Sequence, residues 1–158
     1  MSLPEVKLLF KKNYLAMIRN AAKGENHMFR NVYALVDGVE RDILEDGNLS
    51  CAAFVSGVLT LNGLIDRPHA AVGGTIKAME QAGWVTTDEP RDGAVLSWES
   101  ITYDDKRTHG HLGFYIGNNR AISNASNASG IPREHHWTYE EKRKIQYIWW
   151  HPRLDDER

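Results

Sequence analysis

The sequence contains a single cysteine and lacks any long apolar run. Cys51, the only cysteine among 158 residues, cannot form an internal disulfide, which excludes a disulfide-stabilised scaffold and leaves the redox compartment open. No apolar stretch reaches the roughly 18 residues that cross a bilayer, and Lys7, Lys11 and Lys12 interrupt the apolar core that a signal peptide would need. We therefore expect neither a membrane span nor an export signal within this sequence.

The sequence also lacks a strong excess of charge and any internal repeat. A formal net charge of −2 gives no electrostatic reason to expect nucleic acid or an anionic membrane surface as a partner. The composition, 42% hydrophobic and 25% charged, is that of a folded domain with a core and excludes global disorder. At this length we expect one domain over residues 1–158.

The first half of the chain carries helical signals. Ser2-Leu3-Pro4-Glu5 has the pattern of a capping box, and the apolar spacing that follows predicts a helix that ends at Gly24. Two further helices are predicted over residues 51–62 and about 74–82. Residues 25–48 are polar and mixed in signal, and we expect a loop with short helical turns there.

The second half changes to the period of two that is typical of strands. Four strands are predicted, over residues 94–98, 112–116, 120–125 and 144–150. Residues 126–140, rich in Ser, Asn and Gly, are predicted to be loop. Helices followed by a meander of strands indicate an α+β fold with a short antiparallel sheet of about four or more strands. We expect a helical extension over residues 1–47 that packs on a core over 48–153.

Cys51 stands at the predicted start of the second helix. Ser50 is the predicted N-cap, which puts Cys51 at the first helical position. The unpaired N–H groups and partial positive charge of a helix N-terminus favour the thiolate, the form of cysteine that acts as a nucleophile. The backbone N–H of Cys51 would also point at the oxyanion of a tetrahedral intermediate. Taken alone, a lone cysteine is more often a small buried hydrophobe than a nucleophile.

His111 begins an alternating strand later in the chain. Histidine is the usual base for a cysteine nucleophile because the pKa of imidazole lies near neutrality. His109, two residues earlier on the same face, is a competing candidate, but it follows the charged loop 104–108. We favour His111 because it lies inside the strand pattern.

An imidazole base needs a third group that fixes its orientation. If Asn118-Asn119 forms a two-residue turn, the alternation of side chains places Asn124 on the face of His111 and Ser123 on the other face. The side-chain carbonyl of an asparagine can accept the imidazole N–H, as in Cys-His-Asn enzymes. Asn124 is therefore the predicted orienting residue.

Three segments resemble motifs of the NlpC-type cysteine peptidases, papain-like enzymes that cut the stem peptides of peptidoglycan. The family's cysteine motif, typically Asp-Cys-Ser-Gly-Phe-Val, is similar to Ser50-Cys51-Ala52-Ala53-Phe54-Val55. Its histidine motif, Gly-His-Val-Gly-Ile-Tyr-Ile-Gly, is close to Gly110-His111-Leu112-Gly113-Phe114-Tyr115-Ile116-Gly117. Its first strand, Pro-Gly-Asp-Leu-Val-Phe, is similar to Pro90-Arg91-Asp92-Gly93-Ala94-Val95-Leu96, with Gly and Asp in swapped order.

The third family position is less clearly matched. The next strand of the family often carries His-Ala-Ser, and Asn124-Ala125-Ser126 matches this if one extra residue is allowed; without that residue, Ser123 takes the third position. Family members often place a tyrosine upstream of the cysteine near the oxyanion. Tyr33 is the nearest candidate, although the Gly-Gly that usually follows is missing, and Ser50 stands where the family has Asp.

The resemblance implies a papain-like domain in which Cys51 attacks an amide carbonyl to form a thioester. His111, oriented by Asn124, would act as the acid and base. Further candidates for contacts to the substrate or oxyanion are Tyr33, Ser50 and Ser123. The implied substrate is a peptide or peptidoglycan fragment. No cofactor is expected, and no metal, because the seven histidines lack the ligand spacing of a zinc site.

Two other functions fit the same sequence. An amidase or acyltransferase of the same fold would act on another small amide, as a toxin, an effector or a phage enzyme does. A non-catalytic binding module would keep the fold without the chemistry. The sequence leaves the oligomeric state open. It also leaves open whether the protein is cytoplasmic, or is exported, injected or phage-delivered to the cell wall.

Overall fold

The computed structural model describes residues 1–155 and has an α+β fold, which confirms the predicted class. Residues 156–158 of the predicted domain lie outside the described residues. The helices are α1 (Phe10–Ala21), α2 (Cys51–Leu61) and α3 (Val72–Gln81), with a short 3-10 helix at Pro152–Asp155. The strands are β1 (Tyr33–Val36), β2 (Val39–Asp42), β3 (Val85–Thr87), β4 (Val95–Thr102), β5 (Thr108–Tyr115), β6 (Arg120–Asn124), β7 (Pro132–His136) and β8 (Ile145–Trp150).

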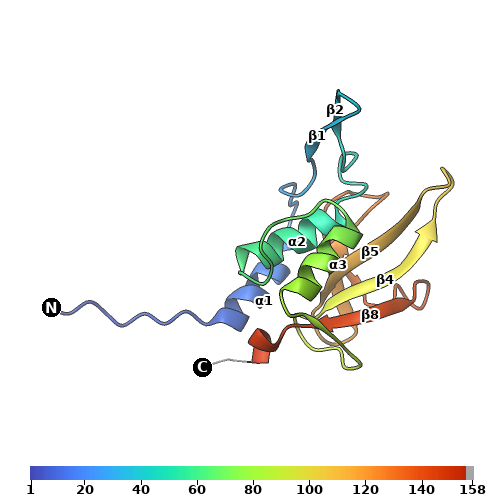
Figure 1. Ribbon diagram of the computed structural model, residues 1–158. Coiled ribbons are helices and arrows are strands. Elements are labelled where there is room, and N and C mark those ends of the chain that lie inside the picture. Colours follow the sequence, from blue (N-terminus) through green and yellow to red (C-terminus); the bar gives the residue numbers. More distant parts are fainter. Residues whose placement is uncertain (156–158) are drawn as a thin grey trace.

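One antiparallel sheet organises the body of the protein. Its strand order is β3-β8-β4-β5-β6-β7, so that the last strand of the chain is inserted between β3 and β4. The helices gather on one side of this sheet (Figure 1). Strands β1 and β2 pair with each other in a separate two-stranded sheet. The strands predicted over 94–98, 112–116, 120–125 and 144–150 correspond to β4, β5, β6 and β8.

Helix α2 is the central helix because its apolar residues occur nearly all round its surface. Phe54 of α2 contacts Phe114 of β5, with ring centroids 5.5 Å apart and planes at 86°. Phe114 in turn meets the edge of Tyr14 of α1 at 6.0 Å. All three aromatic side chains are fully buried. This packing fixes the start of α2 against the middle of the sheet.

Helix α1 begins at Phe10, eight residues after Ser2, the predicted N-cap. Residues 1–9 are exposed and form no helix, so the helix predicted from Ser2 is wrong in its first turns. Figure 1 shows this N-terminal segment leaving the body of the protein. A helix in water depends on burying an apolar face, and only from Tyr14 and Ile18 onward does the helix reach the core. There the hydroxyl of Tyr14 donates a hydrogen bond to the Gly93 carbonyl at 2.8 Å.

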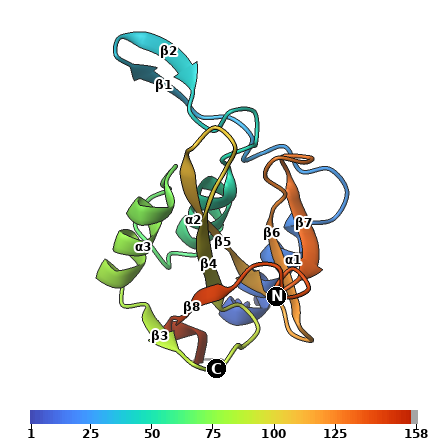
Figure 2. The ribbon, with the colours of Figure 1, turned by 90° about the vertical axis from the view of Figure 1, so that its right-hand side faces the viewer.

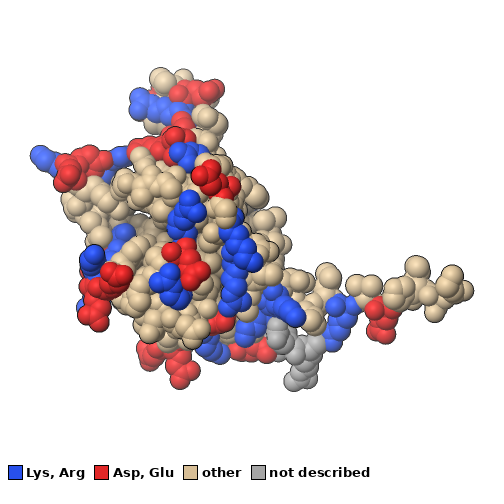
Figure 3. Space-filling model, turned by 180° about the vertical axis from the view of Figure 1, so that it is seen from behind, with Lys and Arg blue, Asp and Glu red and all other residues tan. Residues whose placement is uncertain are grey.

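Residues 25–48 contain a hairpin instead of the predicted helical turns, so the predicted extension over 1–47 is only partly helical. Strands β1 and β2 are joined at Asp37-Gly38, whose φ values of 51° and 78° are those of a two-residue hairpin turn. The hairpin projects away from the rest of the molecule (Figure 2). Seen from behind, acidic and basic side chains are interspersed over the hairpin and the body (Figure 3).

Strand β7 lies inside the segment predicted to be loop. It pairs only with β6 and begins at Pro132, a residue that strands tolerate at an edge or at their first position. Its few apolar residues gave no period-two signal, because an edge strand of polar residues obtains its stability from backbone pairing. Through β7 and the turn that follows, His135 and Tyr139 reach the body of the sheet.

Candidate active site

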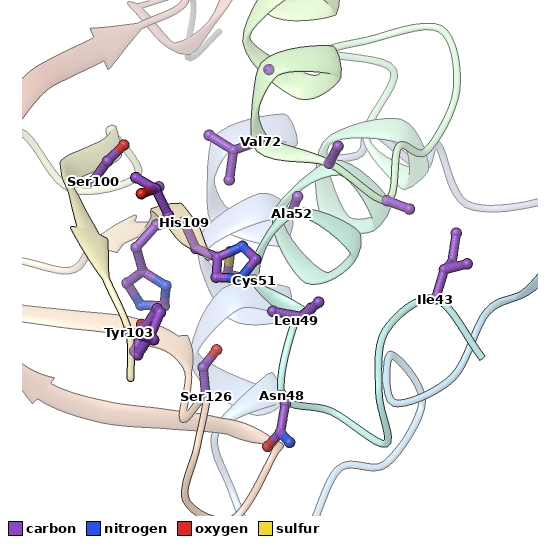
Figure 4. A pocket seen from close by; sticks show the side chains of 16 residues that line it. Ile43, Asn48, Leu49, Cys51, Ala52, Val72, Ser100, Tyr103, His109 and Ser126 are labelled. Atoms are coloured by element: carbon purple, nitrogen blue, oxygen red, sulfur yellow. The ribbon is translucent and has the colours of Figure 1, made fainter. Parts of the chain in front are cut away.

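Cys51 and His111 line one pocket of about 560 Å³ between the start of α2 and strand β5. Asn48 and Leu49, from the loop before α2, also line the pocket, and Leu49 lies beside Cys51 in Figure 4. Ser100, Tyr103 and His109 line the opposite side of the same pocket. The structure thus brings the cysteine and the histidine that the sequence paired into one pocket. Cys51 is buried there, with 6% exposure.

Cys51 is the first residue of α2, as predicted, but Ser50 does not cap the helix with its side chain. The Ser50 carbonyl accepts the first helical hydrogen bond, from the N–H of Phe54 at 2.9 Å. The Ser50 hydroxyl instead donates to the Arg30 carbonyl at 3.4 Å. Ser50 thus holds the preceding segment rather than the helix start, and it does not line the pocket.

The thiol of Cys51 is neutral in this environment. Burial raises its pKa, although hydrogen bonds from the backbone N–H groups of Leu112 and Ala52, and the positive charge of Arg143, act in the opposite direction. The helix start alone therefore does not produce a resting thiolate. What it does provide is a set of N–H groups around the sulfur that favour negative charge when it develops there.

His111 is held by two hydroxyl groups. Its Nε2 lies 3.0 Å from the Oγ of Ser123 and 2.8 Å from the hydroxyl of Tyr139, both within hydrogen-bonding distance. Burial, followed by the charges of Arg143 and His135, lowers the pKa of His111 to about 3. Among residues 1–155, no hydrogen bond joins His111 to the sulfur of Cys51. The resting pair is a neutral thiol and a neutral imidazole in one pocket.

Strand β6 places Ser123, and not Asn124, beside His111. The observed pairing sets Gly113 opposite Ser123 and Tyr115 opposite Ala121, so the connection is one residue longer than the predicted two-residue turn. A shift of one residue exchanges the two faces of a strand. The register behind the choice of Asn124 is therefore wrong, and the alternative residue occupies the position next to the imidazole.

Asn124 points to the opposite face of β6. Its side-chain amide donates to the carbonyl of Gly47 at 2.7 Å and contacts the hydroxyl of Ser126 at 3.3 Å. Gly47 belongs to the loop that leads into Ser50 and Cys51. Asn124 thus holds the loop before α2 and does not contact His111.

Gly113 explains why β5 and β6 approach so closely here. A Cβ at this position would lie 2.7 Å from the Cβ of Ser123 and 2.9 Å from the ring of Trp98. Any side chain would push Ser123 away from the imidazole. The glycine two residues after His111 is the signal in the sequence that could have indicated the register, because a close approach of this kind requires the absence of a side chain.

Tyr33 lies far from the chemistry that was predicted for it. It is on β1 of the projecting hairpin, is 67% exposed and does not line the pocket. A different tyrosine, Tyr139, contacts His111, and sequence reasoning missed it because the turn after β7 carries no motif. The signal that could have indicated Tyr139 is absent from the local pattern, since it reaches His111 only through the pairing of β7 with β6.

Aromatic rings surround the histidine. The ring of Trp98 lies 5.1 Å from that of His111 and 5.5 Å from that of Tyr139, measured between centroids. The indole N–H of Trp98 donates to the Trp137 carbonyl at 2.8 Å, which fixes the ring. This aromatic wall keeps water away from Nε2 of His111, which is the physical reason for the lowered pKa.

His109 also lines the pocket, so the competing candidate is close to the site. Its ring lies 5.6 Å from that of Tyr103, and its Nε2 is buried without a hydrogen-bond partner among the described residues. The guanidinium of Arg143 donates to the carbonyl of His109 at 3.2 Å and to that of Glu99 at 3.0 Å. Arg143, which sequence reasoning did not single out, is thereby fixed near the pocket.

Comparisons with family models, curated proteins and solved structures find no match for this chain. Within residues 1–155, no group of three or more His, Cys, Asp or Glu side chains is arranged to hold a metal ion. No helix in the described part of the chain has the length and apolar character needed to cross a membrane.

Proposed function

We propose that this protein is a papain-like cysteine hydrolase that cuts an amide bond in the stem peptide of peptidoglycan. One observation carries the proposal. Cys51 and His111 line one pocket, while the Nε2 of His111 is held by Ser123 and Tyr139. A structural cysteine would need neither a histidine in the same pocket nor hydroxyl groups that fix the orientation of that histidine.

The first step forms the thioester. The sulfur of Cys51 attacks the scissile carbonyl carbon as its proton moves to the free Nδ1 of His111, and the carbonyl oxygen becomes an oxyanion. Burial disfavours either charge alone, but proton transfer creates opposite charges side by side, so each offsets the cost of the other. The N–H groups at the start of α2 stabilise the oxyanion.

The second step releases the amine and then the acid. The imidazolium of His111 gives its proton to the leaving nitrogen as the C–N bond breaks, which leaves the acyl group on Cys51. The neutral imidazole then accepts a proton from water, and the resulting hydroxide attacks the thioester. The thiol recovers its proton from His111, so the cycle consumes one water and one amide.

The substrate class is supported by the resemblance of the cysteine and histidine motifs to NlpC-type peptidases. The pocket is compatible with a peptide, because the small residues Ala52, Ala70, Ala71 and Gly73 contribute to its wall. Small side chains leave room for an extended backbone beside the thiol.

Digestion of purified peptidoglycan tests the proposal. Wild-type protein and Cys51→Ala are incubated with intact sacculi, and released fragments are identified by mass spectrometry. We expect new peptide termini with the wild type and none with Cys51→Ala. Identical fragment profiles for the two proteins would remove the cell-wall substrate, and a panel of small amides would then test an amidase of the same fold.

A non-catalytic binding module is the second candidate, and the raised pKa of Cys51 favours it. Such a module would bind the peptide without cleaving it. Wild-type protein that retains a muropeptide in a pull-down, yet releases no fragment after prolonged incubation, would support this candidate over the hydrolase.

A further inference from the structure

The Nε2 of His111 faces a cluster of Ser123, His135 and Tyr139. The Oγ of Ser123 lies 2.7 Å from the Nε2 of His135 and 2.9 Å from the hydroxyl of Tyr139. With the two contacts to His111, four hydrogen-bond contacts connect these side chains. The rings of His135 and Tyr139 stack with centroids 4.1 Å apart and planes at 14°.

The donors and acceptors of the cluster can be assigned from one backbone carbonyl, that of His136, which can only accept. The backbone oxygen of His136 lies 2.8 Å from the Nδ1 of His135 and also accepts the N–H of Tyr139 at 2.9 Å. A carbonyl can only accept, so Nδ1 of His135 carries a proton. Burial lowers the pKa of His135, which keeps the ring neutral, and its Nε2 is therefore an acceptor.

This assignment of His135 determines where the protons of Ser123, Tyr139 and His111 lie. The single proton of Ser123 goes to the Nε2 of His135, so the Oγ of Ser123 must accept in its other contacts. If Nε2 of His111 had no proton, its contact with Ser123 at 3.0 Å would join two acceptors. If Nε2 of His111 carries the proton, that N–H is shared between the oxygens of Ser123 and Tyr139, and Tyr139 donates to Ser123, so no contact joins two acceptors without a proton.

We propose that His135 and Tyr139 are positioning residues that hold His111 in the tautomer with its proton on Nε2, which leaves Nδ1 free to act as the base. This inference rests on the proposed function. His135 acts on the reaction through Ser123, and Tyr139 acts through its direct contact with His111; neither residue lines the pocket.

The backbone around Tyr139 supports a role of this kind. Tyr139, Glu140 and Glu141 all have left-handed conformations, with φ values of 52°, 57° and 65°. Bulky non-glycine residues avoid this region, and three in succession persist only where the surroundings hold them. The conformation brings the phenol of Tyr139 against both His111 and Ser123.

Nitrogen NMR of the wild-type protein tests the inference without any activity. With 15N-labelled histidine at pH 7, we expect a pyrrole-like chemical shift for Nε2 of His111 and a pyridine-like shift for its Nδ1. The reverse assignment would overturn the inference. Because this measurement uses the unmodified chain, it remains decisive if a variant of the cluster fails to fold.

Two substitutions of His135 then test its control of the tautomer. In His135→Phe the stacked ring remains but cannot accept the Ser123 proton, so we expect the Nδ1 shift of His111 to move toward the pyrrole-like range. In His135→Gln the amide oxygen can accept that proton, and the wild-type shifts should return. Unchanged shifts in a folded His135→Phe would overturn the inference.

Kinetics add a readout on the reaction itself. We expect His135→Phe to lower kcat with little change in KM, by at most the ~10⁴-fold that follows when a triad histidine adopts the wrong tautomer. His27→Gln is the matched control, because the exposed side chain of His27 bonds Glu25 and Arg30, outside the cluster. Wild-type protein with the expected tautomer and no hydrolysis would contradict the proposed function and leave the tautomer assignment standing.

Discussion

The core around α2 buries polar side chains, whereas the β1–β2 hairpin exposes apolar ones. In the core, polar groups such as Ser123 and His111 are buried and hydrogen-bonded to one another. On the hairpin, apolar side chains such as Tyr33 and Leu35 are exposed, at 67% and 74%. Burying polar groups costs free energy unless they are paired. The buried polar side chains of the core therefore depend on their specific hydrogen-bond partners.

We therefore expect substitutions in the core to change activity or the free energy of unfolding, and substitutions of exposed hairpin side chains to change neither. The core places the imidazole of His111 against Ser123 and Tyr139, and the proposed chemistry depends on those partners. The hairpin is held by the backbone pairing of β1 with β2 and, at its base, by hydrogen bonds to the carboxylate of Asp42. Substitutions in the two regions should therefore differ in their effects on activity and stability.

The largest expected effect is that of removing the thiol. We expect Cys51→Ala to lower the rate of amide cleavage by at least about 10³-fold, because no other group in the pocket can form the thioester. Initial rates on a defined muropeptide measure the change. A residual rate within tenfold of the wild type would show that Cys51 is not the nucleophile.

Two aromatic residues compare the stability of the two regions. Phe114→Ala removes a fully buried ring and should lower the free energy of unfolding by about 3–5 kcal/mol. Tyr33→Ala on the hairpin should change it by less than about 0.5 kcal/mol and leave activity unchanged. Urea denaturation gives both values. A loss of activity in Tyr33→Ala would place the hairpin in the site after all.

The stability of the core should depend on pH through His111. Its pKa of about 3 in the folded protein lies below the ordinary value of 6.5, so the unfolded chain binds the proton first as the pH falls. Stability is therefore full above about pH 6.5 and declines toward pH 3, with a loss of about 2 kcal/mol between pH 7 and pH 5. Denaturation of wild type and His111→Gln at both pH values measures the difference. An equal decline in both proteins would assign the effect to other groups.

The two faces of β6 give the smallest expected change. Ser123→Ala should reduce kcat about tenfold, the equivalent of one hydrogen bond to His111, with the fold intact. Asn124→Ala should instead lower the free energy of unfolding by about 1–3 kcal/mol, because the Gly47 carbonyl loses its partner. Kinetics and thermal melts of the pair separate the roles. The reverse pattern would restore the register predicted from the sequence.

Strong local signals predicted most of the core. The apolar residues around α2 and the alternation along β5 are consequences of burial, and burial leaves its period in the sequence. Cys51 and His111 were predicted as a pair because each lies in such an element. The α+β order of the elements followed for the same reason.

Features that depend on pairing at a distance could not be predicted in this way. One additional residue in the connection between β5 and β6 moved Asn124 to the wrong face, and nothing in the local pattern fixed that length. The contact of Tyr139 with His111 requires β7, a polar edge strand without periodicity. The capping box at Ser2 failed because a local motif cannot supply the surface that a helix must bury.

Mass spectrometry of the acid-quenched protein detects the proposed thioester on Cys51 directly. Wild-type protein is mixed with a muropeptide, quenched in acid within the first turnover and digested, so that the mass of the peptide containing Cys51 can be measured. We expect an acyl adduct on Cys51 that disappears at longer times and is absent from Cys51→Ala. Cleavage of the muropeptide with no adduct at any time, or cleavage by Cys51→Ala at the wild-type rate, would contradict the proposed thioester.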